Sequence, residues 1–248
     1  MKLKDFFKEN NKAAIAFSGG VDSAYLLFAA KQSGAEVKAY YVKSVFQPQF
    51  ELEDALRFAK EWDIELEVIC TDVLGKKEIA LNPPDRCYYC KKTIFSEIIN
   101  AARNEGFSLL LDGTNASDDV KDRPGIRALQ ELQVRSPLRE CGLTKQEIRT
   151  LSREAGLFTW DKPAYACLAT RIMPGTNITE EMLLKTEQAE NFLFDLGIRD
   201  FRVRMLGDAA KIQVPADQFK KVLEERERIV TELKRYYRCV LLDLEGRG

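Results

Sequence analysis

Residues 13–23 read AAIAFSGGVDS, an apolar run that stops at a pair of glycines and leads at once into a helix-forming stretch. The run at 13–17 predicts a buried strand, and AYLLFAAKQ after residue 23 predicts a helix that ends at Gly34. Glycine tolerates positive φ and has no Cβ, so the backbone can turn sharply between the two elements. The segment therefore predicts a strand, a tight turn and a helix.

This turn has the properties of a phosphate-binding loop. The N–H groups at a helix start converge, and the helix dipole there favours an anion. The hydroxyls of Ser18 and Ser23 can donate to phosphate oxygens, and Asp22 is suited either to Mg²⁺ or to capping the helix. The loop lacks the Gly-Lys-Ser/Thr of a Walker A motif, and a Gly-Gly turn with an ordinary helix cap is the alternative. The expected ATP-binding residues here are Ser18, Gly19, Gly20, Val21, Asp22 and Ser23.

Strand and helix patterns alternate beyond this segment. Further strands are predicted at 37–42, 64–70, 109–111 and 134–138, with helices between them. Thr144-Lys145-Gln146-Glu147 fits a capping box that starts one of these helices. Such alternation is typical of an α/β fold with a doubly wound parallel sheet.

The pattern changes after the aperiodic, proline-containing segment 160–175. The remaining sequence predicts a helix at 180–196, strands at 201–205 and 211–214, a helix at 216–235 and a strand at 239–242. This is a small α+β unit, which we expect to support substrate binding or oligomerisation. The predicted domains are therefore 1–172 and 173–248.

Composition excludes several functions. The 248 residues have a net charge of -1 and no histidine. The missing histidine excludes Ser-His-Asp catalysis and imidazole bases, and the lack of a basic excess disfavours nucleic acid as partner. No apolar run is long enough for a membrane span, and no apolar stretch follows the N-terminal lysines. We expect a cytoplasmic protein with a small-molecule partner.

Two further segments fit a nucleotide site at the carboxyl edge of the sheet. Tyr40–Ser44 ends the second predicted strand, where we expect Ser44 near the adenine. Asp112–Asn115 ends another strand, and its Gly113 and Thr114 are expected to reach ribose or phosphate. The sequence Asp-Gly-Thr is equally typical of a plain turn. The polar stretch 115–123 is predicted to be a loop over the same edge.

The clustered cysteines indicate metal binding or catalysis. Cys87 and Cys90 have the spacing that lets two thiolates face one ion or cluster, and Cys167 lies in the aperiodic segment. Three thiolates do not make a structural zinc site, which needs four ligands, but they can hold a 4Fe-4S cluster with one iron open. A helix-terminal pair without metal is the alternative for Cys87 and Cys90. Cys70, on the apolar face of a predicted strand, is expected in the core.

Seven motifs then match one family in order and spacing. They are SGGVDS, RCYYCK, DGTN, VRSPLRE, GLTKQEIR, WDKPAYACLATRI and GIRDFRVRMLGDAAKIQV. Together they resemble the LarE-type sulfur transferases of the PP-loop ATP pyrophosphatase superfamily, over nearly the whole chain. CLATR is the most specific part, since the phosphate loop also occurs in NAD synthetase, GMP synthetase and tRNA thiolases.

The resemblance implies a function. Such enzymes use ATP and Mg²⁺ to adenylylate pyridinium biscarboxylate mononucleotide and convert the carboxylate to a thiocarboxylate, in nickel-pincer nucleotide biosynthesis. Some members sacrifice the sulfur of one cysteine, and others are thought to use a 4Fe-4S cluster on three cysteines. The three-thiol pattern of this chain favours the cluster. The transferred sulfur would then come from sulfide or a cysteine-derived donor. Family members form hexamers, so a homo-oligomer is expected.

The resemblance also implies residue roles. It makes Cys167 the sulfur-bearing position and a catalytic residue with Arg171 and Asp22, and it places Thr170 beside the acyl-adenylate. Arg202 and Arg204 would bind the phosphate of the substrate nucleotide, although alternating exposed charge on a small sheet is the plain alternative. Glu190 would help hold a divalent metal, and Asp118 or Asp119 is a further candidate.

Two rival functions remain at this point. A tRNA thiolase also uses the phosphate loop and is able to use three thiols and a cluster. A non-catalytic nucleotide- or cluster-binding sensor would keep the loop but never release AMP.

Overall fold

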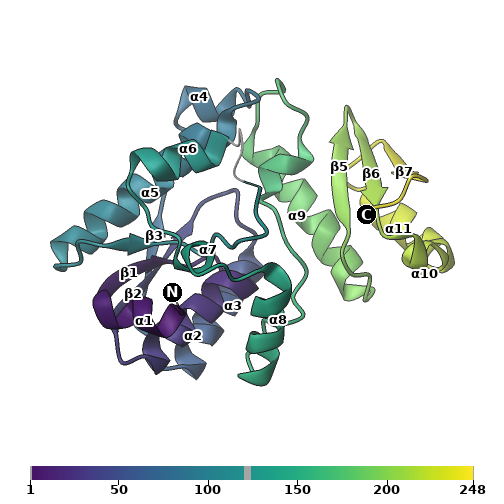
Figure 1. Ribbon diagram of the computed structural model, residues 1–248. Helices are drawn as coiled ribbons and strands as arrows, with labels where there is room; N and C mark the ends of the chain where they lie inside the picture. The colour runs from purple at the N-terminus through teal and green to yellow at the C-terminus, as the bar shows by residue number, and fades with distance from the viewer. Residues whose placement is uncertain (1, 120–123, 248) are drawn as a thin grey trace. The chain divides into compact units, whose positions relative to one another are not determined.

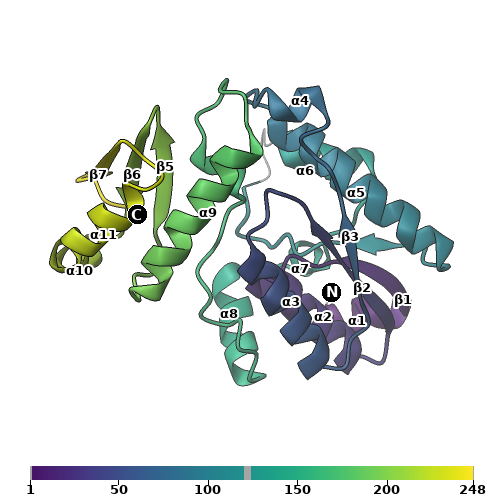
Figure 2. The same ribbon diagram turned by 180° about the vertical axis from the view of Figure 1, so that it is seen from behind.

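The structure, a computed structural model, describes residues 2–119 and 124–247 (Figures 1 and 2). The chain packs into two compact units, one of Met1–Val73 with Asp85–Lys162 and one of Leu74–Pro84 with Pro163–Gly248. The second unit thus begins at residue 163 rather than 173, and it includes an earlier segment. Residues 120–123 of the predicted polar loop lie outside the described part of the chain.

Hydrogen bonds explain why the earlier segment belongs to the second unit. Asn82 Nδ2 donates to the Met173 carbonyl at 2.8 Å, and the Asn82 carbonyl accepts from Gly175 N at 2.7 Å. Ile178 N donates to the Ala80 carbonyl at 2.7 Å. These bonds join helix α4 (Lys77–Ala80) and its following turn to the segment before α9 (Glu180–Asp195).

The first unit contains the predicted parallel sheet. Its strands are β1 (Lys12–Ala16), β2 (Glu36–Lys43), β3 (Leu66–Cys70) and β4 (Leu110–Leu111). Their order is β3-β2-β1-β4, and all neighbouring pairs are parallel. Helices cover both faces of the sheet (Figures 1 and 2). The α/β, doubly wound fold class is confirmed.

Strand alternation assigns side chains to the two faces. Ala13 and Ile15 of β1 belong to one buried cluster, whereas Ala14 belongs to the other. The first cluster is covered by α1 (Leu3–Glu9), α2 (Val21–Gln32), α3 (Gln49–Glu61) and α8 (Lys145–Glu154). The second is covered by α5 (Arg86–Asn104) and α6 (Pro124–Glu131). Burial on both faces is why these strands are apolar rather than alternating.

Two details of the first unit differ from the sequence-based expectation. The strand predicted at 134–138 reduces to one parallel bridge between Leu111 and Arg135, because Pro137 begins helix α7 (Pro137–Glu140). Cys70 is exposed rather than in the core. It ends β3, an edge strand whose residues are at most half-buried.

The second unit has a three-stranded sheet in the order β5-β6-β7. Strand β5 (Arg202–Leu206) is antiparallel to β6 (Ala209–Gln213), which is parallel to β7 (Cys239–Leu242). The helix predicted at 216–235 is instead a 3-10 turn, η2 (Ala216–Gln218), followed by α10 (Phe219–Glu224) and α11 (Arg226–Leu233). The small α+β unit is confirmed.

Within residues 2–119 and 124–247, no helix combines the length and apolar composition that crossing a membrane requires.

The capping box of α8 is confirmed and gives a test of the fold. Thr144 Oγ1 accepts from Glu147 N, and the Glu147 carboxylate accepts from Thr144 N at 2.8 Å. Thr144→Ala should lower the free energy of unfolding by about 1 kcal/mol in a denaturant titration of the full chain. Thr150→Ala, at an exposed position within the same helix, is the control and should not destabilise. Equal stability of the two variants would contradict the capping role.

Candidate functional site

The candidate phosphate loop, Ser18–Ser23, connects β1 to the first turn of α2. Gly19 has a φ of +72°, a region that favours glycine, and Gly20 is the N-cap of α2. Ser23 Oγ accepts from Ser18 N at 3.2 Å and donates to the Gly20 carbonyl at 3.2 Å. The loop is therefore a tight turn wrapped around the N-terminus of α2, where free N–H groups favour an anion.

Two glycines allow close packing of backbone around this loop. A Cβ on Gly19 would lie 3.1 Å from the Glu51 carbonyl oxygen, and one on Gly113 would lie 2.8 Å from Ser23 N. Gly113 follows β4, next to β1 in the sheet. The structure thus brings Gly113 to the phosphate loop at the carboxyl edge, where doubly wound sheets bind ligands.

Asp22 has one occupied and one open carboxylate oxygen. Its Oδ2 accepts from Lys145 Nζ at 2.6 Å, whereas the buried Oδ1 has no hydrogen-bond partner among the described residues. Burial raises the pKa of Asp22, and Lys145 opposes this effect while Asp118 adds to it. Because Gly20 caps the helix without help from Asp22, the capping alternative is not observed. An open buried carboxylate oxygen suits Mg²⁺, which takes one or two carboxylates together with phosphate oxygens.

Two lysines that sequence reasoning left without a role contact this region. Lys145 pairs with Asp22, and Lys162 Nζ donates to the Gly19 carbonyl at 3.2 Å and to Asp54 Oδ2 at 2.6 Å. Both lie in family motifs given above, GLTKQEIR and WDKPAYACLATRI, and no other signal in the sequence pointed to them. Ammonium groups here complement a polyanionic ligand.

The hydroxyls of Ser44 and Thr114 are engaged in turns. Ser44 Oγ donates to Gln47 Oε1 at 2.7 Å. Thr114 Oγ1 donates to the Asp112 carboxylate, which also accepts from Ser136 Oγ at 2.6 Å. Both turns follow parallel strands at the edge that holds the phosphate loop. Their location agrees with the expected nucleotide site, and their contacts with ATP stay a prediction.

Cys87 and Cys90 lie one turn apart at the start of α5, so they share one side of the helix. Cys87 is exposed, Cys90 is half-buried, and Arg86 Nη2 lies 3.7 Å from Cys87 Sγ. In the described ranges, no group of three or more Cys, Asp or Glu side chains is arranged to hold a metal. The pair supplies two of the three thiols that the expected cluster needs.

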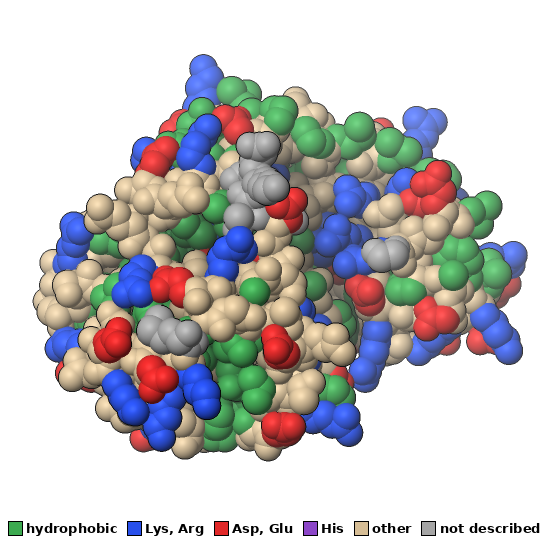
Figure 3. Space-filling model, viewed as in Figure 1, with side chains coloured by type: hydrophobic (Ala, Val, Ile, Leu, Met, Phe, Trp, Pro, Cys, Tyr) green, Lys and Arg blue, Asp and Glu red, His purple; other side chains and the backbone are tan. Residues whose placement is uncertain are grey.

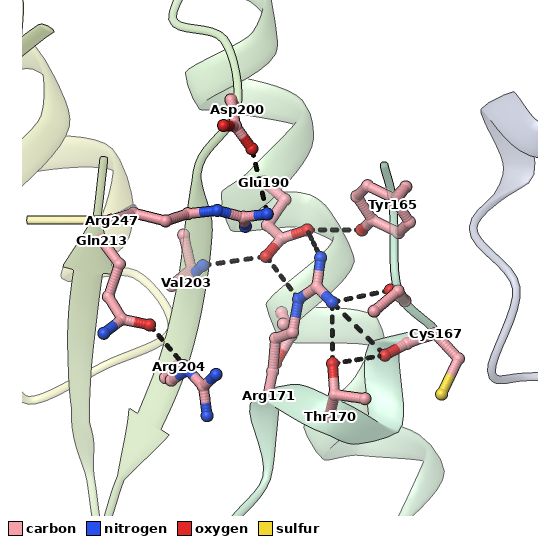
Figure 4. A network of polar contacts seen from close by, with 12 residues as sticks. Tyr165, Cys167, Thr170, Arg171, Glu190, Asp200, Val203, Arg204, Gln213 and Arg247 are labelled. Carbon is pink, nitrogen blue, oxygen red and sulfur yellow. Dashed lines mark hydrogen bonds and ion pairs between the residues drawn. The ribbon is translucent and has the colours of Figure 1, made fainter. Parts of the chain in front are cut away.

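Cys167 comes directly before a 3-10 turn, η1 (Leu168–Arg171), in the second unit. Thr170 N and Oγ1 donate to the Cys167 carbonyl at 3.0 and 2.9 Å, and Arg171 Nη1 donates to the Ala166 carbonyl at 2.6 Å. Arg171 is also paired with Glu190, and both are almost fully buried. The Cys167 sulfur points away from this network (Figure 4). The backbone around the thiol is therefore fixed by its neighbours.

Basic side chains gather over β5 (Figure 3). Arg202 and Arg204 alternate with the buried Val203, so they share the opposite face. The buried Nε of Arg202 has no hydrogen-bond partner in the described part of the chain. Burial, followed by the guanidinium groups of Arg247, Arg171 and Arg204, lowers the pKa of Arg202. Crowded guanidinium groups with an open buried donor are suited to an anion.

The expected site residues divide between the two units. The first unit holds Ser18, Gly19, Gly20, Val21, Asp22, Ser23, Ser44, Cys87, Cys90, Gly113 and Thr114. The second holds Cys167, Thr170, Arg171, Glu190, Arg202 and Arg204. In the first unit the structure brings Gly113 to the phosphate loop, and in the second it links the Cys167 loop (residues 165–171) to β5 through Glu190.

Known proteins are similar to the chain over most of its length. An uncharacterised protein of Synechocystis sp. is 36% identical over 252 residues, covering 98% of this chain and 92% of that protein. Pyridinium-3,5-bisthiocarboxylic acid mononucleotide synthase of Lactiplantibacillus plantarum is 33% identical over 242 residues, covering 96% and 88%. The chain belongs to the LarE family.

Two partial matches place this LarE-family enzyme in the PP-loop ATP pyrophosphatase superfamily. The family profile of queuosine biosynthesis protein QueC matches residues 12–81, which include the phosphate loop. A tRNA-specific 2-thiouridylase, MnmA 2 of Clostridium botulinum, is 27% identical over 181 residues, covering 60% of this chain and 51% of that protein. The family expected from the motifs is confirmed, and with it an ATP-dependent sulfur transferase.

The close approach of Gly113 to Ser23 gives a test of the nucleotide site in this LarE-family chain. In Gly113→Ala, the Cβ would lie 2.8 Å from Ser23 N, so the loop must move. We expect the Kd for ATP, measured by calorimetry, to rise at least tenfold, about 1.4 kcal/mol. Gly125→Ala is the control, since the described atoms nearest its Cβ belong to the flexible Lys91 side chain, the first at 3.0 Å. Equal ATP affinity of both variants would contradict a nucleotide site at this loop.

Proposed function

We propose that this enzyme uses ATP to adenylylate a carboxylate of pyridinium biscarboxylate mononucleotide and then converts that carboxylate to a thiocarboxylate, a step in nickel-pincer nucleotide biosynthesis. The observation that carries the proposal is the open, buried Asp22 oxygen beside the phosphate loop. The substrate is taken from the similarity to pyridinium-3,5-bisthiocarboxylic acid mononucleotide synthase, which spans nearly the whole chain.

The first step is activation of the substrate. A carboxylate oxygen attacks the α-phosphorus of ATP, the bond to the bridging oxygen breaks, and pyrophosphate leaves with the electron pair. Amides of Ser18–Ser23 would bind the pyrophosphate, and Lys145 and Lys162 add positive charge beside it. Mg²⁺, held by Asp22, would neutralise phosphate charge. A carboxylate is nucleophilic at neutral pH, which agrees with a chain that has no histidine.

The second step is sulfur transfer. A sulfur nucleophile attacks the acyl carbon of the mixed anhydride, and AMP leaves. We propose that Cys87, Cys90 and Cys167 ligate a 4Fe-4S cluster, which would supply a transferable sulfide. After each turnover, free sulfide or a cysteine-derived donor would restore that sulfide. The shared side of Cys87 and Cys90 on α5 supports this ligand set. In the alternative, the Cys167 sulfur itself attacks, and its Cβ–Sγ bond breaks with loss of the Cα proton, leaving dehydroalanine.

The second unit would hold the substrate nucleotide. We propose that its phosphate binds Arg202 and Arg204, because the crowded arginines leave a buried donor open. Thr170 and Arg171, which hold the backbone beside Cys167, would border the acyl-adenylate. The phosphate and the reacting carboxylate of one substrate would then be held by adjacent segments of this unit.

Sulfur transfer to tRNA is the second candidate, and the similarity to MnmA 2 favours it. A tRNA partner requires many phosphate contacts and usually a basic surface, whereas the net charge here is -1. We therefore place the mononucleotide first. A non-catalytic sensor is disfavoured because the chain belongs to an enzyme family.

We also propose a cytoplasmic homo-oligomer. Six cysteines in 248 residues are too few for a disulfide scaffold, which agrees with a reducing compartment. Several large apolar side chains of the second unit are exposed, among them Phe194 at 54%, Leu223 at 61% and Leu244 at 78%. A contact between copies of the chain would remove such side chains from water.

Pyrophosphate release tests the activation step. With ATP, Mg²⁺ and pyridinium biscarboxylate mononucleotide, the enzyme should release pyrophosphate and form AMP after sulfur transfer. Asp22→Asn should slow pyrophosphate release at least a hundredfold, since the carboxylate charge beside the phosphates is lost. Asp5→Asn, an exposed carboxylate on α1 outside the candidate site, is the control and should keep most of the activity. Release that depends on tRNA, or none at all, would contradict the proposed substrate.

Anaerobic purification tests the source of sulfur. We expect iron and acid-labile sulfide that are lost when Cys87 and Cys90 are both replaced by Ser, with Cys167 keeping its mass after one turnover. Cys239→Ser, an exposed cysteine outside the proposed ligand set, should keep the iron. An iron-free enzyme whose Cys167 loses the mass of H₂S after one turnover would rule out the cluster.

A further inference from the structure

The Glu190 carboxylate contacts two segments of the second unit at once (Figure 4). It lies on α9 and is 3% exposed. Its Oε1 accepts from Arg171 Nε at 2.8 Å and from Val203 N at 2.8 Å. Its Oε2 accepts from Arg171 Nη2 at 3.0 Å and from the Tyr165 hydroxyl. Four hydrogen bonds thus occupy both oxygens.

Two of the three donor residues, Tyr165 and Arg171, belong to the Cys167 loop. Tyr165 and Arg171 lie on either side of Cys167 in the sequence, and the Arg171 guanidinium lies 4.5 Å from the centre of the Tyr165 ring. Arg171 also donates to the Ala166 carbonyl at 2.6 Å. A two-point guanidinium–carboxylate pair fixes both distance and angle. The position of Glu190 therefore sets the position of the loop.

The remaining donor residue, Val203, belongs to β5. Val203 lies between Arg202 and Arg204 on β5, which pairs with β6 alone. An edge strand has unpaired N–H groups on its open side, and the N–H of Val203 is bonded to Glu190 instead of to another strand. Glu190 therefore supplies the acceptor that the open edge of β5 lacks, at the residue between the two arginines.

We infer that Glu190 is a positioning residue that fixes the spacing between the Cys167 thiol and the Arg202–Arg204 anion site, acting through Arg171 and Val203. The inference rests on the proposed function in one respect, which is the identity of the groups that these two segments bind. A divalent metal on Glu190 would have to displace donors from a saturated carboxylate, so these contacts favour positioning over the metal-binding role expected from the family resemblance.

The spacing matters because one substrate must meet both segments. With the phosphate held on β5, the activated carboxyl group must come within bonding distance of the sulfur. Misplacement by about 1 Å can cost about a hundredfold in rate. Loss of Glu190 should therefore slow sulfur transfer more than adenylate formation, whose phosphate loop belongs to the first unit.

Glu190→Gln tests this difference, with Glu181→Gln, an exposed carboxylate in the first turn of the same helix, as control. Glutamine keeps the size but has a single acceptor oxygen. In single turnovers we expect the ratio of the rate of thiocarboxylate formation to the rate of pyrophosphate release to fall about a hundredfold, with the Mg²⁺ requirement unchanged. An unchanged ratio would overturn the inference, and so would a raised Mg²⁺ requirement, which would identify a metal ligand.

A second readout does not depend on activity. The rate at which iodoacetamide alkylates Cys167, followed by mass spectrometry of its peptide, should rise several-fold in Glu190→Gln and in Arg171→Lys, which loses the two-point pair. The double variant should react no faster than either single variant, because all three variants lose the same contact between Arg171 and Glu190. Tyr165→Phe, which removes one hydrogen bond, should show a smaller rise in the alkylation rate. It provides the test if the other variants do not fold.

Unchanged alkylation in these variants would overturn the inference, and so would additive rises in the double variant. If the wild-type enzyme releases no pyrophosphate, the proposed function fails, whereas the alkylation rates still decide the role of Glu190.

Discussion

The first unit depends on a steric constraint at the turn between β1 and α2. Neighbouring backbone approaches this turn on two sides, and a Cβ on Gly19 would lie 3.1 Å from the Glu51 carbonyl while one on Gly113 would lie 2.8 Å from Ser23 N. Because both positions are glycine, the end of β4 can lie against the first turn of α2. The helix N-terminus is then held at the carboxyl edge of the sheet, with Asp22 half-buried beside it. Anion binding at a phosphate loop of this kind depends mainly on backbone N–H groups and less on side chains.

The two units use charge in different ways. In the first, Lys145 neutralises one oxygen of Asp22 and leaves the other open, so the centre is prepared for a cation together with an anion. In the second, the pair of Arg171 and Glu190 is saturated and buried, whereas Arg202 on β5 has a buried Nε with no hydrogen-bond partner among the described residues. Buried ion pairs contribute little net stability but break at a large cost when one partner is removed. This favours a geometric role for the saturated pair and a binding role for Arg202 and its open donor.

Local signals in the sequence were sufficient for most of the fold. Apolar runs located the parallel strands, and Thr144 with Glu147 located the start of α8, because each pattern is set by residues close in the chain. The strand expected at 134–138 failed because Pro137 favours a helix start, and Cys70 is exposed because its strand lies at a sheet edge that no local pattern reveals. Long-range contacts were out of reach: Lys162 and Gly19 are 143 positions apart. The partners of Glu190 were missed for the same reason, since hydrogen bonds between distant segments leave no periodicity.

The hydrogen bonds of α4 and its following turn have a consequence for how this protein can be divided. The chain passes between the units at 73/74, 84/85 and 162/163, so the second unit is assembled from two separate stretches. A fragment that starts at Pro163 would leave the N–H groups of Gly175 and Ile178 without the carbonyls of Asn82 and Ala80. A single cut in the chain would therefore not release the second unit as one complete fragment.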